Sequence, residues 1–250
     1  MKPFDKNIAD ILISGGVGVI PTDTIYGLVG RAEMTSTVER IYRTRKRNAH
    51  KPCIILISSY EDLKKFNIEI SSETRLFLET RRLWPGKVSI VFPSTNPRFE
   101  YLTRGTNSLA FRMPDVHELR DLLTQTGPLI APSANREGDP PAATIISARQ
   151  YFKDSIDFYV DGGEMHSLPS TLIQVSDGKI TTLREGARDA TIITSNNNSL
   201  LRMPKNKIAY WILATLLAGA FGFVGFLKVS THPMEIELFT RFGYPLWFMY

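Results

Sequence analysis

The segment PTDTIYGLVG, Pro21–Gly30, gathers side chains that can bind a small polar ligand. Two hydroxyls (Thr22 and Thr24), a carboxylate (Asp23) and a phenol (Tyr26) follow the apolar stretch GVGVI, which predicts a short buried strand. Polar groups collected where a rigid strand ends are typical of binding sites. We therefore expect one wall of a pocket here, although threonines are also ordinary strand residues.

A second candidate segment is the basic run RTRKRNAHKP. Its cations are Arg43, Arg45, Lys46, Arg47 and Lys51. Such a run can hold phosphate groups, but it can equally be a solvated helix end, where cations complement the helix dipole. A third interpretation is a surface patch that binds nucleic acid. The run contains no aromatic beyond Tyr42, and base-stacking platforms need more.

Two further polar segments come after, or beside, apolar strands. PSAN ends at Asn135 and follows PLIA, and PST (Pro169–Thr171) is paired in our reading with LREGA, which holds Arg184. Ser133 and Asn135 can also serve simply as caps of the turn after their strand. Each of the four segments (PTDT, the basic run, PSAN, and PST with LREGA) can thus be interpreted as structural or as functional.

The absence of common nucleotide-binding and metal-binding motifs limits the kinds of site that the sequence can form. The sequence has no G-x-x-x-x-G-K-[ST], no G-x-G-x-x-G and no G-x-S-x-G, so a bound nucleotide would be held by scattered Arg and Lys. One such cation about 4 Å from a phosphate charge gains roughly 4 kcal/mol at an effective dielectric near 20. No H-x-x-H, H-E-x-x-H or C-x-x-C pair exists, so we expect no metal site built by the protein. Cys53, the single cysteine, cannot form an internal disulfide and is expected in the core.

Helical and strand patterns alternate along the first three quarters of the chain. Helices are expected over residues 5–16, 35–45, 59–66, 71–83, 115–127 and 144–152, with a Ser/Thr cap before Glu39 in the second and Asp115 capping the fifth. Strands are expected over residues 17–21, 53–57, 87–92, 108–113, 128–135, 157–163, 170–176 and 179–186. This interleaving predicts an α/β fold with a mixed, strongly twisted open sheet and a concave ligand cleft.

The composition changes sharply near residue 195. We expect a catalytic domain over residues 1–190, a polar, Asn-rich linker over 191–207 and a hydrophobic tail over 208–250. Ile208–Leu227 has 20 residues and no charge, so as a helix it would span about 30 Å and could cross a bilayer. A buried core helix is the alternative. Lys and Arg just before this span favour a cytoplasmic catalytic domain on a chain anchored in the membrane.

Taken together, the segments resemble the YrdC-like threonylcarbamoyl-AMP synthases over roughly residues 8–187. The motifs stand in family order: PTDTIYGL, Arg45-x-Arg47 with KP, LWPG, LAFRMP, PLIAPSAN, PST and REGA. The chain departs from the family at Arg45, usually Lys, at Asn48, often Pro, and at Lys87, usually Pro. More loosely, the tail is similar to the start of a DoxX-like membrane protein.

The resemblance implies an enzyme, a nucleotidyltransferase that makes L-threonylcarbamoyl-AMP and pyrophosphate from L-threonine, bicarbonate or CO₂, and ATP with Mg²⁺ on its phosphates. The product would pass to the t6A transferase machinery, which modifies tRNA. The resemblance places threonine at Thr22, Thr24, Tyr26 and Arg112, makes Arg47, Lys51 and Arg184 catalytic, and assigns the nucleotide to Arg45, Arg47, Lys51, Ser133, Asn135, Ser170 and Arg184. The alternative is a non-catalytic RNA-binding module that uses the same basic cleft.

Overall fold

Short strands alternate with helices in the computed structural model, which describes residues 4–176, 179–189 and 215–218. The chain divides into two compact units, residues 1–197 and 198–250. The elements are α1 (Lys6–Ile13), β1 (Gly18–Ile20), β2 (Gly27–Arg31), α2 (Thr35–Arg45), β3 (Ile54–Leu56), η1 (Tyr60–Phe66), α3 (Ser72–Thr80), β4 (Val88–Pro93), η2 (Pro97–Phe99), α4 (Glu100–Thr103), β5 (Ser108–Arg112), α5 (His117–Thr126), β6 (Leu129–Ile130), α6 (Ile145–Phe152), η3 (Lys153–Ser155), β7 (Phe158–Tyr159), β8 (Thr171–Ser176) and β9 (Lys179–Arg184).

One sheet organises the first unit. Within the described residues it has nine strands, in the order β7-β1-β2-β6-β3-β5-β4-β8-β9. The pairs β1–β7, β3–β5 and β4–β8 are parallel, and the other neighbours are antiparallel. The predicted α/β class with a mixed, twisted open sheet is therefore confirmed.

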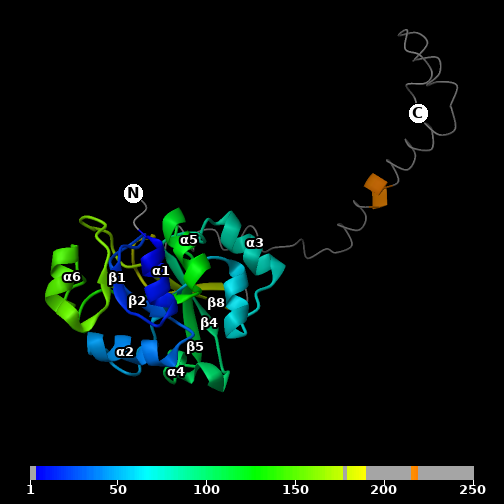
Figure 1. Cartoon of the computed structure of the whole chain (residues 1–250). Helices are drawn as coiled ribbons and strands as arrows, with labels where there is room; N and C mark the ends of the chain where they lie inside the picture. Colours follow the sequence, from blue (N-terminus) through cyan, green and yellow to red (C-terminus); the bar gives the residue numbers. More distant parts are fainter. Residues whose placement is uncertain (1–3, 177–178, 190–214, 219–250) are drawn as a thin grey trace, which may run out of the picture. The chain divides into compact units, whose positions relative to one another are not determined.

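Alternation along the strands sends neighbouring residues to opposite faces of this sheet. Leu28 and Ile55 pack into one hydrophobic cluster, while Val29 and Leu56, the next residues along β2 and β3, pack into another. Helices α1 and α5 cover the second cluster and lie side by side in Figure 1. Helix α2 contributes Ile41 to the first cluster. The two faces thus have separate helical covers.

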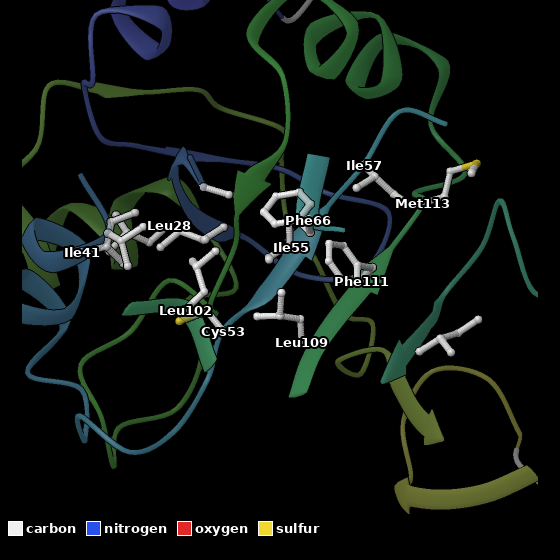
Figure 2. Packing of buried hydrophobic residues seen from close by; sticks show 14 of the residues in the cluster. Leu28, Ile41, Cys53, Ile55, Ile57, Phe66, Leu102, Leu109, Phe111 and Met113 are labelled. Atoms are coloured by element: carbon white, nitrogen blue, oxygen red, sulfur yellow. The ribbon is translucent and has the colours of Figure 1, made fainter. Parts of the chain in front are cut away.

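Aromatic side chains fill the centre of the first cluster. The ring of Phe66 lies 5.1 Å from that of Phe111, edge to face, and 5.4 Å from that of Phe99. Figure 2 shows Phe66 and Phe111 close to Ile55 on β3, with Cys53 at the start of that strand. Cys53 is a free cysteine with 5% of its surface exposed, so the prediction that it lies buried is confirmed.

The predicted caps of two helices were wrong. Helix α5 begins at His117 behind an extended Val116, so Asp115 lies one position too early to cap it. Helix α2 follows Met34, and no side chain caps it. The segment Tyr60–Phe66, expected as a helix, is a 3₁₀ helix.

Strand β2 was not expected from the sequence, because its GLVGR segment contains two glycines, which are unfavourable in strands. The structure gives the reason for Gly30. A Cβ atom at this position would overlap the Thr37 methyl group of α2. Glycine here lets α2 pack directly on the sheet.

Among the described residues, no helix is long and apolar enough to cross a membrane. The predicted span Ile208–Leu227 lies outside the described residues apart from the helical residues 215–218, and so does the predicted linker, 191–207. The boundary predicted at residue 190, the C-terminal hydrophobic helix and the membrane anchor therefore stay predictions.

Candidate functional site

A cleft of about 330 Å³ opens on the face of the sheet that α1 and α5 cover elsewhere. Its floor is apolar and comes from alternate residues of neighbouring strands. Ile54 on β3 is paired with Ala110 on β5, and Ala110 is paired with Val91 on β4. Ile55, the residue after Ile54 on β3, points into the core on the other face of the sheet. The volume suits a small-molecule ligand.

The turn between β1 and β2 forms one end of the cleft. Thr22, Thr24 and Arg112 all line it. Arg112 donates from Nη1 to the Thr24 hydroxyl (2.7 Å) and from Nη2 to the Thr22 hydroxyl (3.4 Å). The two hydroxyls lie 3.1 Å apart. The structure thus brings together three of the four residues predicted to bind threonine around one guanidinium group.

Asp23 balances the charge of Arg112 from outside the cleft lining. Its Oδ1 atom lies 3.3 Å from Arg112 Nη2, and both side chains are almost fully buried. Burial raises the pKa of the Asp23 carboxyl, and the nearby Arg112 only partly opposes this. Burial also lowers the pKa of Arg112. This end of the cleft therefore holds a buried, compensated ion pair.

Tyr26, the fourth predicted threonine-binding residue, lines the cleft, but its hydroxyl is engaged by the protein. It donates to the Gly163 carbonyl (2.8 Å) and accepts a hydrogen bond from the Gly162 amide (2.8 Å). Burial raises the pKa of this phenol. Tyr26 thus anchors the loop after β7, and its contact with threonine stays a prediction.

Arg47 lines the cleft from the loop between α2 and β3. Its Nε donates to the Lys51 carbonyl (2.9 Å) and its Nη2 to the Pro52 carbonyl (2.8 Å). Two neutral backbone acceptors therefore fix one edge of the guanidinium, and neither carries a charge that would cancel its own.

Arg184, at the end of β9, is also held by a backbone carbonyl. Its Nη2 donates to the Ser170 carbonyl (2.7 Å), and both residues line the cleft. The Ser170 hydroxyl lies 2.8 Å from that of Ser89. A Cβ atom at Gly186 would overlap the backbone of Pro169–Thr171, so glycine allows the REGA segment to pack against PST. The structure confirms that these two segments lie side by side.

Arg45 and Asn135 are buried and do not line the cleft. Arg45 donates from Nε to the Ser133 carbonyl (2.7 Å) and from Nη2 to the Ser133 hydroxyl (2.9 Å) and Asn135 Oδ1 (2.8 Å). Burial lowers the pKa of Arg45 to about 10. This geometry places Arg45 in support of the PSAN turn, where Ser133 does line the cleft. The nucleotide contacts of Arg45 and Asn135 stay predictions.

Lys51 is also absent from the cleft lining. Its ammonium group lies 2.7 Å from Glu137 Oε1, and its side chain is 61% exposed. The amide of Asn48 donates to the other oxygen of the same carboxylate. Glu137 thus joins the basic loop to the loop after PSAN. No sequence pattern predicts this pairing, because the partners lie 86 residues apart.

The charged residues in the described cleft lining are Arg47, Arg112 and Arg184, with no carboxylate among them. Burial lowers the pKa of Arg184, and the charge of Arg47 lowers it further. Arg184 in turn contributes to the lowered pKa of Arg112. Cations that raise one another's electrostatic energy make a site for anions. Within the described part of the chain, no group of three His, Cys, Asp or Glu side chains can hold a metal ion.

Two hydroxyl-bearing residues of the described cleft lining that we did not predict are Thr106 and Ser108, whose hydroxyls lie 3.1 Å apart. A signal for Ser108 was present in SLAFRM, because it shares strand parity with Arg112. Thr106 lies in the loop before β5, and no periodic pattern covers it.

Comparison with known proteins gives consistent matches. The family described as Telomere recombination (Sua5/YciO/YrdC) matches residues 10–186. The chain is 33% identical over 181 residues to the threonylcarbamoyl-AMP synthase of Pyrococcus abyssi, covering 71% of this chain and 52% of that one. It is 31% identical over 171 residues to the threonylcarbamoyl-AMP synthase of Marinobacter nauticus, covering 67% and 89%. The chain thus spans about half the length of the first curated relatives it matches.

Solved structures agree on the fold. Pyrococcus abyssi Sua5 complexed with L-threonine superposes with a TM-score of 0.65 at 32% identity, covering 71% of this chain and 52% of that one. Escherichia coli YciO superposes with the same TM-score at 21% identity, covering 74% and 90%, and supports the fold alone.

Proposed function

The chain belongs to the Sua5/YciO/YrdC family, and we propose that it is an L-threonylcarbamoyladenylate synthase. It makes threonylcarbamoyl-AMP and pyrophosphate from L-threonine, bicarbonate or CO₂, and ATP. The curated relatives carry the name of this activity, and one related structure holds L-threonine.

The observation that carries the proposal is the uneven charge of the cleft. At one end Arg112 is compensated by Asp23, which suits a zwitterion such as an amino acid. On the walls Arg47 and Arg184 are bound only to neutral acceptors in the described structure, which suits a polyphosphate. A single cleft that accepts both kinds of ligand can bring an amino acid to a nucleoside triphosphate.

The reaction needs positioning and charge neutralisation more than covalent participation by the protein. The threonine amine loses a proton and attacks CO₂, which gives an N-carboxylate. An oxygen of this carboxylate attacks the α-phosphorus, and the bond from phosphorus to the pyrophosphate oxygen breaks. We assign Thr22, Thr24 and Arg112 to holding threonine, and Arg47 and Arg184 to the negative charge of the phosphates.

The remaining predicted contacts complete this assignment. Ser133 and Ser170 line the cleft and can donate hydroxyl hydrogen bonds to the nucleotide. We also assign Lys51 to the phosphates, and this requires its ammonium group to leave Glu137. Mg²⁺ would arrive on the triphosphate and neutralise part of its charge.

The test is pyrophosphate release by the full chain from ATP, with and without L-threonine and bicarbonate. We expect release only when both are present. L-Serine should be a poorer substrate, because the pocket loses a methyl contact worth about 1 kcal/mol. Release that ignores threonine would contradict the proposal. RNA binding in the absence of such release would favour the alternative, a non-catalytic RNA-binding module.

We further propose that the product feeds a transferase that modifies tRNA, since threonylcarbamoyl-AMP is an activated acyl donor.

The tail from Ile208 is proposed to associate with membranes, with the catalytic domain on the cytoplasmic side where ATP and tRNA are found. Its support is the uncharged 20-residue stretch Ile208–Leu227. Fractionation of the full chain beside a chain ending at Pro204 tests this: only the full chain should need detergent, and a full chain that stays in solution without it would contradict the proposal.

A further inference from the structure

The backbone carbonyl of Lys51 is the point at which the loop between α2 and β3 is fixed. It accepts one hydrogen bond from Arg47 Nε (2.9 Å) and a second from the hydroxyl of Tyr42 (2.8 Å). Tyr42 lies on α2, is 6% exposed and does not line the cleft. We propose that Tyr42 is a positioning residue, which aims Arg47 at the anionic group of the ligand through this shared carbonyl.

The way Arg47 is bound explains why its aim matters. A guanidinium has five N–H donors in a rigid plane. Arg47 uses one on Nε for the Lys51 carbonyl and one on Nη2 for the Pro52 carbonyl. Three donors remain for a ligand, and they lie in the plane that these two carbonyls define. A small rotation of the Lys51 peptide would therefore tilt the whole ligand-binding edge.

Tyr42 is itself held rigidly. The Arg104 guanidinium stacks over its ring, 3.9 Å from the centroid, and Arg104 lies 2.7 Å from Glu39 Oε1. The carbonyl of Tyr42 accepts a hydrogen bond from the Arg47 amide (3.0 Å) across Lys46, which has a left-handed conformation. Burial raises the pKa of the Tyr42 phenol well above its usual range, so its hydroxyl stays a donor at neutral and mildly alkaline pH.

The hydroxyl can be removed while the backbone carbonyl that it binds keeps a partner. In Tyr42→Phe the ring keeps its place in the core, and the Lys51 carbonyl keeps its bond from Arg47. Asn48 and Lys51 in this loop are exposed, and their bonds to Glu137 lie on the surface. Losing the hydroxyl should therefore loosen the loop, and with it Arg47, while the fold stays intact.

The inference rests on the proposed function only in taking the anion to be the ATP triphosphate, so the experiment measures binding apart from turnover. Binding of ATP and of inorganic tripolyphosphate to the full chain is measured by calorimetry, beside the KM for ATP and for threonine. The variant is Tyr42→Phe. The matched control is Tyr101→Phe, which also removes a partly buried hydroxyl bound to a backbone carbonyl, that of Ala32 (2.9 Å).

We expect Tyr42→Phe to weaken binding of both anions and to raise the KM for ATP by about fivefold. The KM for threonine should change by less than about twofold, and Tm should fall no more than in Tyr101→Phe. In an Arg47→Ala background, Tyr42→Phe should have no further effect on anion binding, because its route to the ligand is gone.

Three results would overturn the inference. Tyr42→Phe could bind both anions as wild type does, or it could add its full effect to Arg47→Ala. A wild-type chain that binds neither anion would overturn it together with the proposed function. A wild-type chain that binds both but releases no pyrophosphate would reject only the activity, and the comparison of variants would still decide the role of Tyr42.

Discussion

The end of the cleft formed by the β1–β2 turn and the walls of the cleft hold their arginines in different ways. Arg112 is surrounded by side chains, two hydroxyls and the carboxylate of Asp23. Arg47 and Arg184 are oriented by the backbone carbonyls of Lys51, Pro52 and Ser170. A carbonyl orients a guanidinium without cancelling its charge, whereas a carboxylate does both. The backbone-held pair is therefore better suited to an anion, and the compensated arginine to a ligand with both charges.

Two carboxylates near these arginines, Asp23 and Glu137, have pKa values shifted in opposite directions. Burial raises the pKa of Asp23, so its charged form is disfavoured in the folded protein. The hydrogen bond from Lys51 and that from the Asn48 amide lower the pKa of Glu137, which is near the surface. One carboxylate is a buried counter-ion, and the other is a rim group in contact with water.

The largest effect is expected for Arg184→Ala. It removes a charge-assisted bond to phosphate, so the KM for ATP should rise roughly 10- to 100-fold. The KM for threonine should change much less. Arg75→Ala, which removes an exposed arginine on α3, is the control for loss of charge. If Arg184→Ala melts several degrees lower and keeps normal ATP kinetics, the residue is structural.

A smaller effect, at the end of the cleft that holds Arg112, is expected for Thr24→Val. The swap conserves shape and leaves Arg112 Nη1 without its nearest acceptor, so the KM for threonine should rise about 5- to 50-fold. ATP binding should change less than about twofold. Thr126→Val on α5, which also removes a buried hydroxyl, is the matched control. Equal losses for both substrates would place Thr24 outside the threonine site.

Opposite dependences of stability on pH are expected for the two carboxylates. For Asp23, whose folded pKa is raised above 3.8, the stabilising contribution is complete below the unfolded pKa and is lost as pH rises through the folded value. For Glu137, whose folded pKa is lowered below 4.5, it is present above the unfolded pKa and is lost as pH falls through the folded value.

Melting curves of wild type, Asp23→Asn and Glu137→Gln from about pH 3 to about pH 7 measure this. The advantage of wild type over Asp23→Asn should shrink as pH rises, and its advantage over Glu137→Gln should grow slightly. Slopes of the same sign would refute the distinction between a buried and a rim carboxylate.

The smallest effect is expected for Glu137→Gln on substrate binding. Its ion pair with Lys51 is exposed and contributes at most about 1 kcal/mol. Freeing Lys51 for phosphate should lower the KM for ATP by about twofold, an effect reduced by salt. Glu164→Gln, at another exposed carboxylate, should leave it unchanged. A higher KM would mean that Glu137 serves chiefly to order the rim.

Much of this comparison could be predicted from the sequence, because strand ends are local features. Apolar runs and turn residues located eight of the strands, and Thr22, Thr24, Ser133 and Arg184 were singled out from polar groups beside those runs. The missed strand β2 contains two glycines, and one of them, Gly30, leaves room for Thr37 of α2. Local propensity carries no information about a helix that packs on the strand.

The different positions and partners of the three cations in the basic run could not be predicted for the same reason. Arg45, Arg47 and Lys51 look equivalent in RTRKRNAHKP. Only the fold shows that Arg45 turns inward to Ser133, that Arg47 lines the cleft and that Lys51 meets Glu137. These partners come from residues about ninety positions away, and a charge pattern carries no information about them.

The order of strands also bears on how the chain folds during synthesis. Strand β4, complete at Pro93, pairs on one side with β5 but gains its other neighbour, β8, only from Thr171 onward. At about 5–20 residues per second, the ribosome leaves this apolar edge unpaired for several seconds. Arg184 arrives later still, so a nascent chain cannot assemble the complete set of cleft arginines before the first unit is nearly finished. Prematurely released fragments should therefore be targets for chaperones and proteases, and they should not consume ATP.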